Sequence, residues 1–224
     1  MPPMLPDWLN HSIAMRPSER TVLVQQVLAP RVQSYVEWGS GGSTELVAWM
    51  MVSGMTPKEF RAFSIESSVE WMARMRKRSK FIRLAESQGR LRFLHGDIGP
   101  TAHLGYPVNF DPGLQPTRAL PYVDLQRHRH GMGSIDLALV DGRFRLACML
   151  EAITCLTPRS GRVLLHDYSL NDPATRSRSQ SYKRALEFYR VVDHQETLAT
   201  LRPRASINES LRQMVASAAL REAI

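Results

Sequence analysis

Hydrophobic and polar positions along the chain follow two patterns, and together these patterns predict strands that alternate with helices. Short apolar runs flanked by turn residues are typical of strands that are buried in a sheet. Such runs occupy residues 32–38, 60–65, 91–95, 135–140 and 163–166. Two later segments, 189–194 and 197–201, are predicted to pair as a hairpin around Gln195 and Glu196.

Segments between these runs repeat apolar residues every three or four positions, which is the period of an amphipathic helix. The clearest is 143–156, in which one face carries Leu146, Met149, Leu150, Ile153 and Leu156. The other predicted helices are 18–28, 44–52, 68–78, 175–188 and 206–221.

Strands that alternate with helices are joined by right-handed crossovers and form a parallel sheet covered on both faces. We therefore predict an α/β fold, a Rossmann-like three-layer sandwich. Its mostly parallel seven-stranded sheet would end in a C-terminal antiparallel hairpin. The 224 residues fit one domain, with 1–30 as an N-terminal helical extension.

Residues 98–133 interrupt the alternation, because they are rich in Pro, Gly and His and lack a clear period. Long irregular segments in compact domains are usually functional or mobile. We interpret this one as an irregular insertion that covers the site or contacts another protomer, with a disordered insertion as the alternative.

The composition of the chain indicates the cellular compartment in which it is expected to occur. Its longest apolar runs fall far short of the ~20 residues of a membrane span, and its start lacks the features of a secretory signal. Cys148 and Cys155 have the spacing of one helix face and are interpreted as reduced apolar residues. We expect a cytoplasmic protein with no membrane partner; the apolar terminal helices could pair two copies as a homodimer.

The formal net charge of +8 suits an anionic partner such as nucleic acid or a phosphorylated substrate. The basic residues are spread along the chain, so a solvated basic surface is favoured over nucleic-acid binding. Arg143 and Arg145 either bind an anionic substrate or lie on the solvated face of their helix.

A glycine-rich turn, Gly39-Ser40-Gly41-Gly42, follows the first predicted strand and precedes a predicted helix. Glycines let a backbone turn tightly and approach a ligand closely, and the start of a helix offers free N–H groups. Glu37 stands at the C-terminal end of the strand, where open α/β sheets bind ligands. The motif predicts a site for a nucleoside cofactor.

Acidic residues recur after all five strands that are predicted to be parallel. They are Glu37, Glu66, Asp97, Asp141 and, after His166, Asp167. Right-handed crossovers would bring these positions to one edge of the sheet. One such acid is commonly a turn residue or a helix cap, but capping seldom produces five in succession. The second could accept ribose hydroxyls and the third an adenine amine, while the last two face the substrate.

In their order and spacing, these motifs resemble those of class I S-adenosylmethionine-dependent methyltransferases. They are residues 37–44 (EWGSGGST), Ile65-Glu66, Gly96-Asp97, 139–143 (LVDGR) and 161–168 (GRVLLHDY). The most similar subgroup has Asp-Gly after the fourth strand and His-Asp-Tyr after the fifth. The resemblance spans residues 30–200.

The resemblance implies methyl transfer from S-adenosylmethionine to a small-molecule acceptor, with an anionic acceptor as a further option, and S-adenosylhomocysteine as product. Glu37 and the glycine turn would hold the methionine end, Glu66 the ribose, and Asp97 with the backbone of Ile98 the adenine. The implied cofactor-binding residues are Glu37, Gly39, Ser40, Gly41, Gly42, Glu66, Ser67, Asp97, Ile98 and Asp141.

The implied catalytic residues are Asp141, His166 and Asp167, which would line the acceptor site. Because the sulfonium is already activated, the protein mainly aligns the acceptor. A base is needed only for a hydroxyl or protonated amine, and His166 or Asp141 would supply it. The alternative for His166 is a core histidine with satisfied hydrogen bonds.

The chain also departs from the family pattern. Ser43 replaces a frequent third glycine, and Tyr168 replaces the Asn of metal-dependent O-methyltransferases, so we do not favour a divalent metal. A nicotinamide-dependent oxidoreductase is less favoured, because Gly39 and Gly41 fit its Gly-x-Gly-x-x-Gly turn but Thr44 does not. A non-catalytic module that binds the cofactor or nucleic acid is the remaining alternative.

Overall fold

The computed structural model describes residues 6, 13–111, 115, 117–124, 134–169 and 171–204. The side chains of residues 177 and 178 are not described. The predicted helix 206–221 lies outside the described residues. No helix in the described part is both long enough and apolar enough to cross a bilayer.

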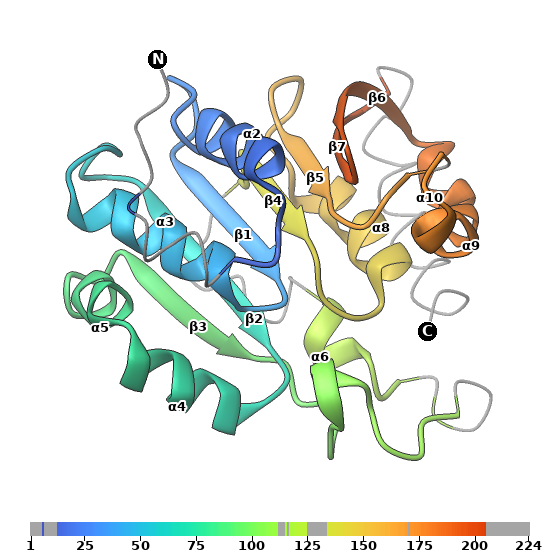
Figure 1. Cartoon of the computed structure of the whole chain (residues 1–224), viewed down its shortest axis with the longest axis horizontal. Coiled ribbons are helices and arrows are strands. Elements are labelled where there is room, and N and C mark those ends of the chain that lie inside the picture. The colour runs from blue at the N-terminus through green and yellow to red at the C-terminus, as the bar shows by residue number, and fades with distance from the viewer. Residues whose placement is uncertain are drawn as a thin grey trace.

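Seven strands form one sheet in the order β3-β2-β1-β4-β5-β7-β6 (Figure 1). The strands are β1 (Ser34–Trp38), β2 (Arg61–Glu66), β3 (Leu91–His95), β4 (Leu137–Val140), β5 (Arg162–Leu165), β6 (Tyr189–Gln195) and β7 (Leu198–Pro203). The first five pair in parallel, and β7 runs antiparallel to both β5 and β6. The predicted α/β architecture and C-terminal hairpin are therefore confirmed.

Helices cover both faces of this sheet. They are α2 (Pro17–Val27), α3 (Gly42–Val52), α4 (Val69–Arg78), α5 (Lys80–Ser87), the short 3-10 helix η1 (His103–Gly105), α6 (Leu120–Val123), α8 (Arg145–Cys155), α9 (Pro173–Ser181) and α10 (Lys183–Leu186). Side chains of α2, α3 and α5 share one core with Tyr35, Leu137 and Leu139. Side chains of α6, α8 and α10 share another with Val36 and residues next to them on the sheet.

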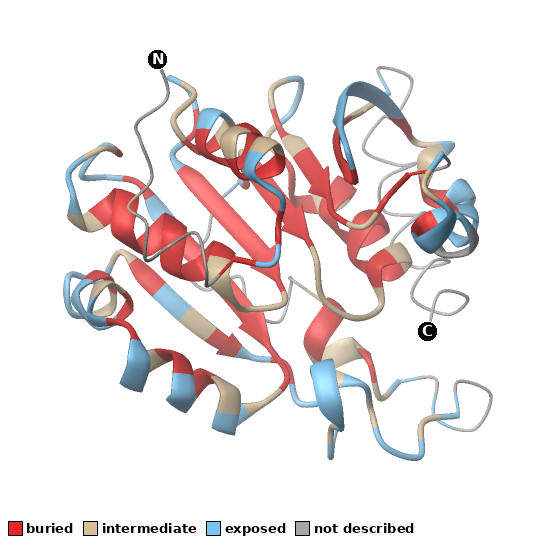
Figure 2. Ribbon diagram, viewed as in Figure 1, coloured by how far each residue is buried: buried red, intermediate tan, exposed pale blue. Residues whose placement is uncertain are grey.

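This division follows from the alternation of side chains along each strand. In β4, Leu137 and Leu139 belong to one core, whereas Ala138 and Val140 belong to the other. The central strands are buried on both faces, but β6 is exposed along nearly its whole length (Figure 2). A continuous apolar run therefore marks a central strand, as expected for parallel sheets.

The structure differs from the sequence predictions in three places. The predicted helix 175–188 is divided into α9 and α10, with Tyr182 between them. Helix α5 was not predicted; it begins after Ser79, whose hydroxyl accepts a hydrogen bond from the N–H of Ile82 at 3.4 Å. The segment expected to be irregular contains η1 and α6.

Tyr122 of α6 anchors this insertion between the ends of β3 and β4. The tyrosine is 2% exposed, and its carbonyl accepts a hydrogen bond from the Trp38 indole at 3.0 Å. A Cβ at Gly96 would lie 2.5 Å from Tyr122 Cα, and one at Gly142 would lie 1.9 Å from the Tyr122 hydroxyl. Glycine is therefore required after both strands because the tyrosine occupies that space.

We expect Gly142→Ala to lower the free energy of unfolding by about 1–3 kcal/mol, the usual cost of overpacking. Gly41→Ala is the matched control, since it has an extended φ of 179° and no atom within 4 Å of an added Cβ. It should cost less than about 1 kcal/mol, through a poorer helix N-cap alone. Urea denaturation measures both values, and equal losses would contradict the packing argument.

Candidate functional site

A cavity of about 1200 Å³ lies at the edge where the five parallel strands end. Its walls include most of the residues expected from the sequence, which are Gly39, Ser40, Gly41, Gly42, Glu66, Ser67, Asp97, Asp141, His166 and Asp167. Two expected residues, Glu37 and Ile98, are completely buried and are not among the lining residues. The cavity also takes Ile13, Ala14 and Met15 from the segment before α2.

The glycine turn packs backbone against backbone on the loop after β4. Gly39 has a φ of +94°, and a Cβ there would lie 2.7 Å from the Cα of Gly142. By contrast, a Cβ at Gly41 would meet nothing within 4 Å. Gly39 thus allows the turn to contact the loop after β4, and Gly41 leaves open space over the turn.

Glu37 supports the turn from below instead of reaching into the cavity. Its carboxylate accepts hydrogen bonds from Tyr35 at 2.9 Å, from the Ser43 hydroxyl at 2.8 Å and from the Thr44 hydroxyl. Burial raises the pKa of this carboxyl, against the opposing effect of these donors. Ser43 and Thr44, which depart from glycine-rich motifs, therefore tie the start of α3 to β1.

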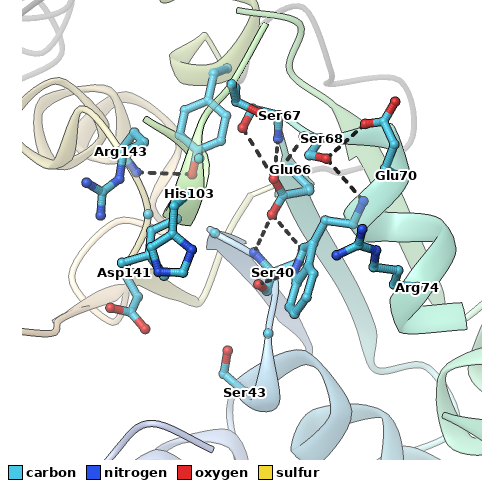
Figure 3. Close-up of a pocket in the computed structure, with 18 of the residues that line it drawn as sticks. Ser40, Ser43, Glu66, Ser67, Ser68, Glu70, Arg74, His103, Asp141 and Arg143 are labelled. Atoms are coloured by element: carbon cyan, nitrogen blue, oxygen red, sulfur yellow. Dashed lines mark hydrogen bonds between the residues drawn. The ribbon is translucent and has the colours of Figure 1, made fainter. Parts of the chain in front are cut away.

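Glu66 joins the glycine turn to the start of α4, as the dashed lines in Figure 3 show. Its Oε1 accepts backbone N–H bonds from Ser67 at 2.8 Å and Ser68 at 2.9 Å. Its Oε2 accepts the Ser40 hydroxyl at 2.7 Å and the Ser40 N–H at 3.2 Å. Ser68, not Glu66, caps α4, because its hydroxyl accepts from the Trp71 N–H at 3.1 Å.

The loop after β3 places Asp97 and Ile98 differently. Asp97 lines the cavity, and its Oδ1 accepts the Gly99 N–H at 2.8 Å, so it is both a turn residue and a cavity residue. The Ile98 side chain is buried in the core, and its carbonyl accepts Nε of Arg118 at 2.5 Å.

Arg145 holds together the carboxylates that follow β4 and β5. One of its terminal nitrogens lies 3.2 Å from Asp141 Oδ1 and 3.0 Å from Asp167 Oδ2. The other donates to the His166 carbonyl at 2.6 Å. Arg145 is only 7% exposed, so the interpretation that it lies on a solvated helix face is wrong. Its single positive charge offsets the repulsion between the two carboxylates.

His166 lies in this cluster and is 6% exposed. Its Nδ1 is 2.8 Å from Asp141 Oδ1, and its Nε2 is 3.4 Å from Glu19 Oε2. Burial favours the neutral ring, but the hydrogen bonds to Asp141 and Glu19 outweigh it and raise the pKa of His166 to about 10. The ring is therefore protonated at neutral pH, which is not the state of a general base.

Glu19 has the opposite shift. Burial favours its protonated form, but hydrogen bonds from His166 and Thr197 lower its pKa to about 2. Thr197 donates through its N–H at 2.7 Å and its hydroxyl at 2.6 Å. No sequence pattern indicated this role for Glu19, because an acid in the first turn of a helix ordinarily signals only a favourable interaction with the helix dipole.

A metal ion at this cluster would have to compete with groups that are already bound there, although the donor atoms are close. Ligand atoms of Asp141, His166 and Asp167 all lie within 4.8 Å of one another. A metal-bound histidine is neutral, so an ion would have to displace a proton from the His166 ring, whose pKa is raised. The Arg145 guanidinium already supplies a cation to both carboxylates.

Residues 99–105 of the insertion line the cavity. A Cβ at Gly105 would lie 3.5 Å from the Ser67 hydroxyl and 3.9 Å from Cγ of Arg143. The Arg143 guanidinium stacks on Tyr106 at 4.0 Å from the ring centroid. In Figure 3, His103 and Arg143 lie on the Asp141 side of the pocket, opposite Glu66 and Ser40. The insertion thus contributes to the site, although nothing in its sequence indicated which residues would.

Comparison with known proteins places this geometry in a structural class. No protein-family model matches the chain, and no curated protein sequence matches it. A solved structure of a methyltransferase-like protein from Silicibacter pomeroyi is similar, with a TM-score of 0.64, 25% identity, and coverage of 93% of this chain and 96% of that one. The calicheamicin methyltransferase CalS11 has a TM-score of 0.50 at 14% identity, covering 81% and 76%. The chain has the fold of class I S-adenosylmethionine-dependent methyltransferases.

The raised pKa of His166 makes stability depend on pH. Its contribution is complete below the unfolded value of 6.5 and is lost as the pH rises through about 10. We expect the free energy of unfolding to fall across this window in the wild type, and to fall less in His166→Gln. Denaturant titrations between these pH values test this, with exposed His103→Gln as control. Equal pH dependence in the wild type and in His166→Gln would refute the assignment.

Proposed function

We propose that this protein is an S-adenosylmethionine-dependent methyltransferase that acts on a small molecule. The observation that carries the proposal is that two groups of residues line one cavity. The glycine turn, Glu66 and Asp97 form one group, and Asp141, His166 and Asp167 form the other. Similarity to solved methyltransferase structures supports the same activity.

The residues present fit the cofactor. Backbone amides hold both oxygens of Glu66 toward the turn, and the Ser40 hydroxyl, which can rotate, occupies a position that a ribose hydroxyl could take. Asp97 is an exposed acceptor for an amine of the adenine, and the space over Gly41 admits the close approach of a ligand. Glu37 would act indirectly, by holding the turn. When bound, the cofactor supplies an electrophilic methyl group.

The acceptor would lie on the Asp141 side. Because His166 is already protonated, Asp141 is the better candidate to accept a hydrogen bond or a proton from the acceptor. Arg145 and His166 both contact Oδ1 of Asp141 and hold this carboxylate in place. In-line alignment of the acceptor, more than base strength, would supply the rate.

An anionic acceptor is supported by Arg143. Its side chain is half-buried at the cavity, and no carboxylate of the described residues pairs with its guanidinium. Tyr106 holds the guanidinium flat, which suits bidentate binding of a carboxylate or phosphate. His103 lines the same cavity.

We expect S-adenosylhomocysteine to bind the wild type in calorimetry and Glu66→Gln to weaken it by about tenfold or more, since a hydrogen bond to a charged group contributes about 1.5–3 kcal/mol. Glu59→Gln is the control, an exposed carboxylate that is not among the residues lining the cavity. Binding of NAD instead of S-adenosylhomocysteine, or binding of neither compound, would overturn the proposed cofactor.

We expect Arg143→Gln to raise KM for acidic acceptors about tenfold, from the loss of a charge-assisted contact. Radiolabelled methyl transfer to hydroxybenzoates, hydroxyphenyl phosphates and the matching neutral hydroxybenzyl alcohols provides the measurement. Exposed Arg92→Gln is the control. Preference for the neutral compounds, or equal KM in both variants, would contradict an anionic acceptor.

A further inference from the structure

Helix α2 reaches the proposed acceptor site through one buried side chain. Glu19 lies in the first turn of this helix, is 1% exposed and points to the end of β5, where it meets His166. Such burial of an acid is costly unless the charge is paired and hydrogen-bonded.

Four groups satisfy the Glu19 carboxylate. Oε1 accepts the N–H and the hydroxyl of Thr197, from the turn between β6 and β7. Oε2 accepts the Arg16 N–H at 2.8 Å and lies 3.4 Å from His166 Nε2. The two donors of Thr197 and the Arg16 N–H hold the carboxylate in place. The contact with His166 Nε2 therefore orients the imidazole.

The orientation of the ring in turn fixes Asp141. With Nε2 directed to Glu19, the other ring nitrogen Nδ1 meets Asp141 Oδ1 at 2.8 Å. Arg145 donates to the same oxygen at 3.2 Å. None of the described residues donates a hydrogen bond to the second oxygen, Oδ2, although Asp141 lines the cavity and its side chain is 25% exposed.

We propose that Glu19 is a positioning residue for the acceptor site: through His166 it holds Asp141 so that Oδ2 is left to accept the O–H or N–H of the acceptor. This inference rests on the proposed methyltransferase function. It assigns to the N-terminal helix a role in the reaction and to one carboxylate oxygen the contact with substrate.

All charged groups around the ring agree with this arrangement. His166 faces Glu19 from α2, Asp141 from the loop after β4 and Asp167 from its own loop, with Asp167 Oδ1 at 3.9 Å. Arg145 of α8 contacts both aspartates and the His166 carbonyl, but not the ring. Removing the charge of Glu19 would leave the ring with one fixed contact in place of two.

The first test is histidine NMR of the isotopically labelled full chain. At pH 8, nitrogen chemical shifts should show protons on both ring nitrogens of His166 in the wild type. Glu19→Gln should lower the pKa of His166 by about 1 unit or more. Glu196→Gln is the matched control, because this exposed glutamate contacts Arg16 and Ser18. An unprotonated ring nitrogen in the wild type, or no shift in Glu19→Gln, would overturn the proposal without reference to activity.

The second test separates positioning from a structural role. With any hydroxybenzoate that the wild type methylates, Glu19→Gln should lower kcat about tenfold or more while the affinity for S-adenosylhomocysteine stays within twofold. Unchanged kcat would overturn the role in the acceptor site. Failure of the wild type to bind S-adenosylhomocysteine would refute the proposed function instead, and the NMR result for Glu19 would still stand.

Discussion

One buried guanidinium organises the functional edge of this sheet. Arg145 brings together carboxylates from two strand ends that would otherwise repel each other. Removing these carboxylates would leave the buried guanidinium without a charged partner, which is destabilising. The placement of Asp141, Asp167 and the His166 backbone therefore depends on this contact.

The cluster around His166 is built from segments near opposite ends of the described chain. Glu19 of the N-terminal helix contacts His166 and is itself held by Thr197, in the turn of the C-terminal hairpin. The sheet brings them together because β7 inserts between β5 and β6, so that the late turn lies beside the end of β5. The last strands thus support the site as well as the fold.

The other side of the cavity depends on space more than on charge. Gly39 and Gly142 approach so closely that neither can carry a side chain, and Tyr122 fills the adjacent volume. Helix α6 is consequently locked against two strand ends, which anchors the loop that carries His103 and Tyr106. A segment without periodicity is thus held at the cavity by Tyr122 together with the buried Ile98, Ala119 and Val123.

The sequence by itself determined the alternation of strands and helices, the C-terminal hairpin and the edge where acids gather, because apolar periodicity and right-handed crossovers are local or general rules. It could not show that Glu37 turns inward, that Arg145 is buried or that His166 carries a proton. Those properties depend on groups distant in the chain: Glu19 is 147 residues from His166. Only the tertiary structure decides which charges share a buried volume, and electrostatic energies and pKa values follow from that proximity and burial.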